Sequence, residues 1–215
     1  LTHVGERRIA TGRDFDARAK LTAKGALHLD LPAAEELAET LRPAQYAVKG
    51  LESKPWTRRP DAPFRTTTLQ QDAGRKLGFT AQRTMSVAQD LYEGGFITYM
   101  RTDSVTLSAT AIRAAREQAV QLYGADSVPA KPRTYPSKVK NAQEAHEAIR
   151  PTSAARTPEQ LAGRLDPDQH KLYTLIWRRA VASQMEAALF DTVAVDLAAG
   201  SGNTLRANGS TLLSP

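Results

Sequence analysis

Hydrophobic and polar residues at both ends of the chain follow the two-residue period that is typical of β-strands. Four segments are expected to form strands: Thr2–Val4, Arg8–Ala10, Gln45–Leu51 and Phe190–Leu197. Gly5 and Glu6 favour a turn between the first two, and the glycines at 200 and 202 favour a reversal after the last. One helix is expected between these strands, over Ala33–Leu41.

The middle of the chain changes to the period of amphipathic helices. Capping residues mark five helix starts: Thr67 with Gln70, Thr80, Ser108, Thr157 before Pro158, and Asp166 before Pro167. Glycines mark three helix ends: Gly78, Gly94 with Gly95, and Gly124. The predicted inner faces are Thr84, Val87, Ala88, Leu91 and Tyr92 in the second helix, Ile112, Ala115, Ala119 and Leu122 in the third, and Leu172, Tyr173, Ile176, Trp177, Ala180 and Gln184 in the last.

Two segments are expected to connect the helices with the strands. Ser53–Arg65 contains three prolines, which disfavour helix and remove backbone donors, so we expect an extended hinge there. We expect a second hinge at Arg150–Pro158, where the chain would return from the helical domain. The simplest architecture is an α+β fold with a helical domain inserted between strands of one sheet. Because the first expected strand has no visible beginning at Leu1, we expect the chain to be a piece of a longer protein.

Positive charge is concentrated in the middle of the chain. The formal net charge is +6, and residues 49–150 carry 16 Lys and Arg against 10 Asp and Glu, while the flanking segments are balanced. Eight of the 13 aromatic residues lie in the same segment, a combination that single-strand binders need, although composition alone favours a basic helical domain whose aromatics fill its own core. The absence of cysteine excludes disulfides and thiolate sites, and no stretch resembles a signal peptide or a membrane span.

The stretch LYEGGFITYMRTDS combines a helix end, a predicted strand over Phe96–Arg101 and a polar turn. On a strand, Tyr99 and Arg101 would share one face, about 6–7 Å apart along it. Phe96, Thr98 and Met100 would take the other face. A phenol is a weak nucleophile because its pKa is near 10, but a nearby guanidinium favours the phenolate and can grip a phosphate. The pair fits attack on a phosphate, although such pairs are usually ordinary half-buried contacts.

This stretch resembles the active-site region of type IA DNA topoisomerases, in which the tyrosine of ITYMRTDS forms a 5'-phosphotyrosyl bond with the cut strand. Ile97–Ser104 matches it in full. The resemblance extends to four further blocks: APFRTTTLQQDAGRKLGF (Ala62–Phe79), the helix up to Leu91–Glu93, NAQEAHEAIRPT (Asn141–Thr152) and LYTLIWRRAVASQM (Leu172–Met185). The blocks cover most of residues 60–190 in order, and their wording is most similar to the actinobacterial branch.

The resemblance implies roles for individual residues. Tyr99 would be the nucleophile, Arg101 would hold the scissile phosphate, and His146 would lie near the active site as a hydrogen-bond donor or proton shuttle. Contacts with DNA are expected from Gln70, Gln71, Lys76, Arg83, Gln89, Thr98 and Arg150, each of which could instead be a solvated surface residue.

The resemblance also implies a domain plan and an activity. Residues 1–60 and 186–215 would form parts of a β-rich arch domain, residues 61–155 a helical cap domain, and residues 156–185 a helical segment returning toward the arch. The activity would be ATP-independent breakage, passage and rejoining of single DNA strands, which relaxes negatively supercoiled DNA. The expected location is the cytoplasm, in association with the nucleoid.

Metal binding is expected outside this chain. In the family an acidic N-terminal Toprim domain holds Mg²⁺, and this sequence lacks that domain, so we expect no metal site and no activity from the chain alone. Asp14 with Asp16, and Asp166 with Asp168, have two-carboxylate spacing, but the first pair lies in a turn and the second fits a helix cap. Expected partners are single-stranded and negatively supercoiled DNA and the Toprim domain, with neither membrane nor nucleotide.

Three alternatives remain open from the sequence. The chain could be a single-stranded DNA-binding module without chemistry. It could belong to a tyrosine recombinase or a type IB enzyme, in which case a trapped adduct would carry a 3' rather than a 5' linkage. It could also be a helix-turn-helix regulator over Thr80–Met100, which would bind intact duplex with sequence preference.

Overall fold

The computed structural model describes residues 1–135, 147–200 and 202–214. They form two compact units, one of Leu1–Arg58 with Leu189–Pro215 and one of Arg59–Ala188. The second unit is inserted in the sequence between β3 and β4, two strands that are neighbours in one sheet. The predicted α+β class is therefore confirmed.

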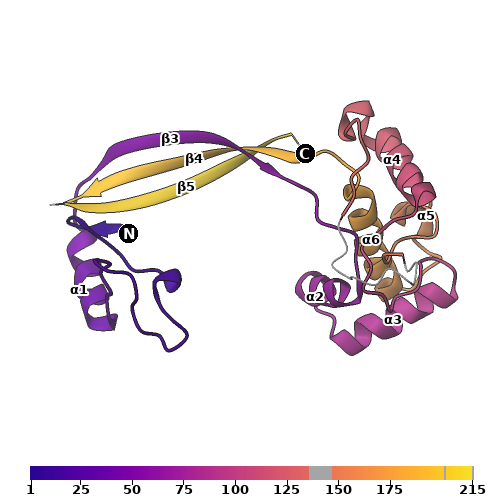
Figure 1. Ribbon diagram of the computed structural model, residues 1–215, viewed down its shortest axis with the longest axis horizontal. Helices are drawn as coiled ribbons and strands as arrows, with labels where there is room; N and C mark the ends of the chain where they lie inside the picture. The colour runs from indigo at the N-terminus through magenta and orange to yellow at the C-terminus, as the bar shows by residue number, and fades with distance from the viewer. Residues whose placement is uncertain (136–146, 201, 215) are drawn as a thin grey trace. The chain divides into compact units, whose positions relative to one another are not determined.

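The first unit, called the strand unit below, is built on a five-stranded sheet with the order β2-β1-β5-β4-β3. Its strands are β1 (His3–Val4), β2 (Arg7–Arg8), β3 (Tyr46–Arg58), β4 (Ala188–Ala199) and β5 (Asn203–Ser214). Figure 1 shows β3, β4 and β5 side by side. β1 pairs antiparallel with β2 and β5, and β4 pairs antiparallel with β5. The unit also contains the 3-10 turn η1 (Gly12–Asp14) and the helix α1 (Leu31–Leu41), which Asp30 caps by accepting from the Ala33 N–H.

β3 is longer than predicted, and this corrects part of the hinge prediction. The strand continues through Pro55 to Arg58, so only the remainder of Ser53–Arg65 is irregular. Pro55 is tolerated because β3 lies at the edge of the sheet, where a missing backbone donor leaves fewer partners unsatisfied. Tertiary contacts hold the strand: the Ser53 hydroxyl donates to Asp191 at 2.7 Å, and the Trp56 and Phe190 ring centroids lie 5.3 Å apart.

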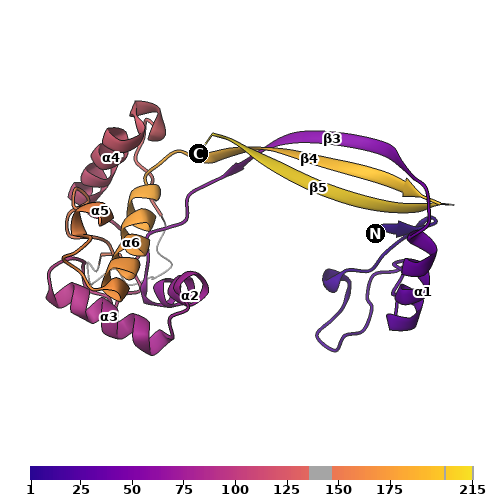
Figure 2. The same ribbon diagram turned by 180° about the vertical axis from the view of Figure 1, so that it is seen from behind.

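The second unit, called the helical unit below, is seen from two sides in Figures 1 and 2. It contains α2 (Thr66–Leu77), α3 (Ala81–Glu93), α4 (Ala109–Tyr123), the 3-10 turn η2 (Ala125–Ser127), α5 (Pro158–Leu161) and α6 (Pro167–Ala182). Four predicted boundaries are confirmed. Thr80 and Ser108 cap α3 and α4, Asp166 with Pro167 begins α6, and Gly78 ends α2 in the left-handed conformation at φ 71°.

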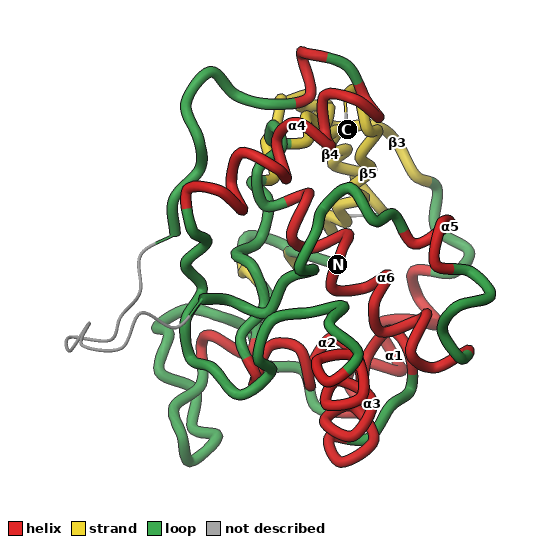
Figure 3. The backbone as a smooth tube through the Cα atoms, turned by 90° about the vertical axis from the view of Figure 1, so that its right-hand side faces the viewer, coloured by secondary structure: helices red, strands yellow, loops and turns green. Residues whose placement is uncertain are grey.

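α6 is the central helix of the unit and packs against α2, α3, α4 and α5 (Figure 3, helices in red). Tyr173 and Ile176 on this helix are fully buried among side chains from α2 and α3. Burial raises the pKa of Tyr173 to about 12, and its hydroxyl donates to the Arg156 carbonyl at 2.6 Å. The buried phenol therefore serves packing and backbone attachment.

Three details of the helices differ from the prediction. The cap of α2 lies two residues before the predicted cap at Thr67, because Arg65 is the capping position and Thr68 completes the box. Leu122 is 45% exposed, and the buried face of α4 consists of Ala111, Ala115, Gln118 and Ala119. Tyr92 is 43% exposed although the rest of the predicted α3 face is buried.

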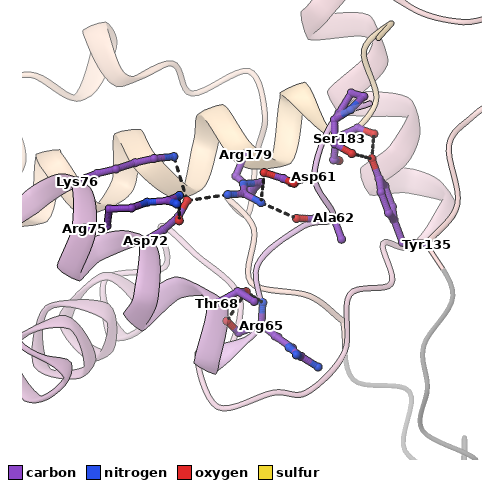
Figure 4. Close-up of polar contacts among 11 residues, drawn as sticks. Asp61, Ala62, Arg65, Thr68, Asp72, Arg75, Lys76, Tyr135, Arg179 and Ser183 are labelled. Carbon is purple, nitrogen blue, oxygen red and sulfur yellow. Dashed lines mark hydrogen bonds and ion pairs between the residues drawn. The ribbon is translucent and has the colours of Figure 1, made fainter. Parts of the chain in front are cut away.

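The chain enters and leaves the helical unit beside α6 (Figure 4). Arg179 pairs with Asp72 of α2 at 2.6 Å and with Asp61 at 3.2 Å. The Tyr135 hydroxyl lies 2.8 Å from the Ser183 carbonyl. These contacts attach the incoming segment and the end of α6 to one core.

The second hinge hypothesis is wrong. Arg150–Pro158 lies inside the helical unit. There the Trp177 indole donates to the Ala154 carbonyl at 2.8 Å, and Pro151 forms an isolated antiparallel β-bridge with Ile97. The chain leaves the unit later, after Ala188. In the described part of the chain, no helix has the length and apolar character needed to cross a bilayer.

Candidate active site

Tyr99 follows the end of α3, where two glycines reverse the chain. Gly95 adopts φ 72°, a conformation that side-chain-bearing residues rarely take, and the Phe96 N–H returns to the Leu91 carbonyl at 2.9 Å. The segment that follows is not the predicted strand: a single bridge between Ile97 and Pro151 is its only ladder contact among the described residues. The reversal, rather than a sheet, therefore sets the position of Tyr99.

One side of the Tyr99 segment is attached to residues 148–152. The Thr98 N–H donates to the Arg150 carbonyl at 2.9 Å, and the Thr98 hydroxyl donates to the Ala148 carbonyl at 2.8 Å. Thr98 also accepts from the Arg150 N–H at 3.0 Å. The Thr152 N–H donates to the Phe96 carbonyl at 2.9 Å. These bonds hold the backbone immediately before Tyr99.

The other side of the segment is attached to the start of α2. The Thr66 hydroxyl donates to the Met100 carbonyl at 2.7 Å, and the Thr66 N–H donates to the Thr102 carbonyl at 3.0 Å. The Thr102 N–H donates in return to the Thr66 hydroxyl at 2.8 Å. Tyr99 is therefore fixed between two anchored stretches of backbone.

Tyr99 is exposed although hydrophobic residues on both sides of it in the sequence are buried. Ile97 is 1% exposed and Met100 is 4% exposed, whereas Tyr99 is 44% exposed. In a strand, Ile97 and Tyr99 would lie on the same face, but one is buried and the other is exposed. The predicted strand geometry is therefore wrong, although the Tyr99 phenol does reach the surface. Arg101 is also exposed. A nucleic-acid strand can therefore approach both side chains.

Tyr92 contacts the candidate nucleophile from the last turn of α3. The ring centroids of Tyr92 and Tyr99 lie 5.3 Å apart at an interplanar angle of 65°, an edge-to-face arrangement. Sequence periodicity assigned Tyr92 to the core. The signal for its actual position is the glycine pair that begins two residues later, at Gly94, and brings the next segment back across the helix end.

The comparisons with known proteins place this geometry in a family. The profile described as DNA topoisomerase matches residues 10–215. The chain belongs to the DNA topoisomerase family. It is 56% identical over 217 residues to DNA topoisomerase 1 of Streptomyces coelicolor and 55% identical over 221 residues to that of Mycolicibacterium smegmatis, covering 99% and 100% of this chain. It spans 23% and 24% of the length of those two topoisomerases.

A solved topoisomerase structure is also similar to this member of the family. Full-length topoisomerase I from Thermotoga maritima matches with a TM-score of 0.67 and 36% sequence identity, over 90% of this chain and 31% of that one. The resemblance inferred from the ITYMRTDS block is thus confirmed over the whole chain, including the similarity to actinobacterial topoisomerases.

Several predicted DNA-binding residues of this topoisomerase chain are already engaged with protein groups. Lys76 pairs with Asp72 at 2.9 Å, and Arg83 pairs with Asp168 at 2.7 Å, a contact that raises the pKa of the Arg83 guanidinium. Gln89 donates to Glu93 at 2.8 Å. Gln71 is exposed, and Gln70 is partly buried. These residues come from α2 and α3, and binding of DNA by the paired cations would require exchange of partners.

The last two members of that set lie beside the Tyr99 segment. Thr98 is occupied by the backbone bonds described above, so its role in this structure is attachment. Arg150 donates to Glu147 through two nitrogens. Burial works to raise the pKa of Glu147, but the hydrogen bonds from Arg150 and Ser108 outweigh it and lower the pKa. His146 lies outside the described residues.

The carboxylates singled out in the sequence have structural partners. Asp14 accepts from Arg8 at 2.7 Å and from the Thr11 N–H at 2.7 Å. Asp166 caps α6, and Asp168 holds Arg83. Over residues 1–135, 147–200 and 202–214, no three His, Asp or Glu side chains lie in a group suited to a metal ion.

Proposed function

We propose that Tyr99 attacks a DNA phosphodiester and carries the 5' end of the cut strand as a phosphotyrosine. The observation that supports the proposal most is an exposed phenol on a segment anchored on both sides, in the ITYMRTDS block of a topoisomerase family member. In this step a bond forms between the Tyr99 oxygen and phosphorus while the bond to the 3' oxygen breaks. The phenol loses a proton and the 3' oxygen gains one, so the reverse reaction rejoins the strand.

No nucleotide is needed for this cycle. One phosphoester replaces another, so the cut strand keeps the energy required for religation. Strain in negatively supercoiled DNA would drive passage of a strand through the break, and relaxation would follow. With chromosomal DNA as substrate, the site of action would be the cytoplasm and the nucleoid.

Arg101 is proposed to hold the scissile phosphate. A guanidinium can donate two hydrogen bonds to phosphate oxygens, and such a donor contributes most when charge accumulates during the reaction. His146 is proposed as a further donor or proton carrier near the same phosphate. Mg²⁺, when bound by a Toprim domain of the complete enzyme, would supply charge that helps to position the phosphate. The described carboxylates of this chain do not fit that role.

The domain assignments are part of the proposal. The strand unit would contribute to the arch and the helical unit to the cap. Lifting of the cap would need bending at the two places where the chain crosses between the units, after Arg58 and after Ala188. This replaces the second of the two hinges inferred from the sequence.

The proposed activity is tested in a full-length enzyme that carries this chain. With Mg²⁺ and without ATP, it is expected to relax negatively supercoiled plasmid, whereas the 215-residue chain alone should bind single-stranded DNA without relaxing it. Relaxation that requires ATP, or that proceeds in the chain alone, would contradict the proposal. Binding without any relaxation by the full-length enzyme would favour the binding-module alternative.

Arg101→Ala is expected to lower the rate of single-strand cleavage by about 10²- to 10³-fold with little change in DNA affinity, because the lost contact strengthens as the reaction proceeds. Arg101→Lys should recover part of the rate, since lysine keeps the charge but not the two-pronged contact. Cleavage under single-turnover conditions measures the rate, and oligonucleotide binding measures the affinity. Cleavage by Arg101→Ala at the wild-type rate would remove this role.

Tyr92→Leu tests whether the Tyr92 ring positions Tyr99. Edge-to-face aromatic pairs contribute about 0.5–1.5 kcal/mol, so cleavage at saturating DNA should slow by roughly 2- to 10-fold while the dissociation constant stays constant. Tyr92→Phe keeps the ring and should retain the wild-type rate. If the two variants behave alike, the contact does not position the nucleophile.

A further inference from the structure

A second surface of the helical unit has the composition of a phosphate site. A hollow of about 400 Å³ is lined by Phe96, Arg156, Gln160, Leu161 and Arg164. Its size is in the range of small-ligand pockets, and two guanidinium groups, an amide and an aromatic ring are groups that bind nucleic-acid backbone and bases.

Hydrogen bonds hold the backbone of Arg156 and Arg164, and they therefore fix the positions from which the two side chains extend. The Arg156 carbonyl accepts from the buried Tyr173 hydroxyl at 2.6 Å, and its N–H donates to the Ser153 carbonyl at 3.2 Å. The Arg164 N–H donates to the Leu161 carbonyl at 3.0 Å, after Gly163 turns the chain at φ 90°. The two side chains are exposed, so they extend into solvent from a rigid base.

The charges of the two arginines are not neutralised within the described residues. None of the ion pairs there involves Arg156 or Arg164, in contrast to Lys76, Arg83 and Arg150. Glu159 is the carboxylate of the adjoining helix α5, and its pKa is lowered by backbone and Thr157 hydrogen bonds and by the charges of Arg178 and His170. Glu159 therefore stays negatively charged, but it does not line the hollow, whereas the two arginines without ion-pair partners do, and their charges favour an anion there.

The hollow is connected directly to the Tyr99 segment. Phe96 lines it and precedes Tyr99 by three residues, a separation of at most about 11 Å along the chain. The Phe96 ring packs on Tyr173 with centroids 6.4 Å apart, and the Thr152 hydroxyl donates to the Gly95 carbonyl at 2.8 Å. A strand that reaches Tyr99 can thus extend into this hollow.

We infer that Arg156 and Arg164 form a backbone subsite for the single DNA strand that Tyr99 attacks, with Gln160 as an added donor. The inference rests on the proposed function for the identity of the strand. Its ligand is the sugar-phosphate backbone of single-stranded DNA, and the partly buried Phe96 lines the hollow beside the two arginines. The subsite would hold the strand a short way from the scissile phosphate without taking part in chemistry.

The test measures binding of a single-stranded oligonucleotide to the 215-residue chain by fluorescence anisotropy over a series of salt concentrations. Each phosphate contact contributes about −0.7 to the slope of log K against log salt. The Arg156→Ala/Arg164→Ala double variant should therefore bind several-fold more weakly, with a slope smaller in magnitude by about 1.4. The Arg156→Lys/Arg164→Lys variant should keep most of the slope, because it keeps the charges.

Arg113→Ala is the matched control, because it removes an exposed arginine from α4, away from the hollow. An unchanged slope in the double alanine variant, or an equal loss in Arg113→Ala, would overturn the subsite. The assay needs no cleavage, so its outcome is separate from the proposed chemistry. If Tyr99 forms no adduct but the double alanine variant still shows the smaller salt slope, the two arginines bind DNA even though the proposed chemistry is wrong.

Discussion

Tyr99→Phe is expected to abolish relaxation of supercoiled DNA by a full-length enzyme that carries this chain. The substitution removes the one oxygen that is proposed to bond to phosphorus and leaves the ring against Tyr92. Loss of the nucleophile in enzymes that form covalent intermediates lowers the rate on the order of 10⁴-fold or more. Time courses with supercoiled plasmid and Mg²⁺ measure the loss.

Tyr123→Phe provides the matched control for this variant. Tyr123 is 59% exposed, compared with 44% for Tyr99, but it lies at the end of α4 rather than in the Tyr99 segment. This variant should relax DNA at the wild-type rate. Binding of single-stranded DNA should be the same in both variants. Relaxation by Tyr99→Phe within tenfold of the wild type would exclude Tyr99 as the nucleophile.

Asp72→Ala is expected to destabilise the helical unit by about 3–5 kcal/mol. Asp72 is 7% exposed and accepts from Arg75 at 2.6 Å, Lys76 at 2.9 Å and Arg179 at 2.6 Å. Its removal would leave the guanidinium of Arg179, whose side chain is 15% exposed, without its closest partner. Chemical denaturation followed by tryptophan fluorescence, in a Trp56→Phe background so that Trp177 of the helical unit is the reporter, measures the free energy of unfolding.

Asp61→Ala is the control for this prediction. Asp61 also pairs with Arg179, at 3.2 Å, but its side chain is 61% exposed. Pairs with an exposed partner contribute about 0–1 kcal/mol, so this variant should unfold close to the wild type. Equal losses in Asp61→Ala and Asp72→Ala would show that burial of Asp72 is not the source of the effect.

The stability difference between wild type and Asp72→Ala should depend on pH in one direction. Burial opposes ionisation of Asp72, but Lys76, Arg179 and Arg75 outweigh it, so the pKa lies below its ordinary value of 3.8. A carboxyl with a lowered folded-state pKa contributes its stabilisation above the ordinary value and loses it as the pH falls through the lower one. The difference should therefore be constant near neutral pH and shrink below about pH 4.

Helix boundaries and the identity of the reactive segment could be predicted because their signals are local. Thr80, Ser108 and Asp166 cap the next turn through their own side chains, and Gly78 supplies the left-handed residue that ends α2. The ITYMRTDS motif was sufficient to identify the family, although it does not reveal the conformation of the segment.

The shape of the Tyr99 segment could not be predicted because distant residues determine it. Its backbone bonds go to Thr66, Ala148 and Arg150, which are 33 or more residues away from Tyr99 in sequence. A local pattern of alternating residues therefore indicated a strand where tertiary bonds impose an irregular turn. The same limit applies to Tyr92, whose exposure depends on the path of the chain after Gly95.

The most direct test of the central claim identifies the atom to which DNA becomes attached. A full-length enzyme that carries this chain is mixed with Mg²⁺ and end-labelled single-stranded DNA, denatured, digested and analysed by mass spectrometry. The account predicts a single modified peptide in which Tyr99 carries the 5' phosphate of the cleaved strand. A nucleotide on any other residue, or one linked through its 3' phosphate, would contradict it.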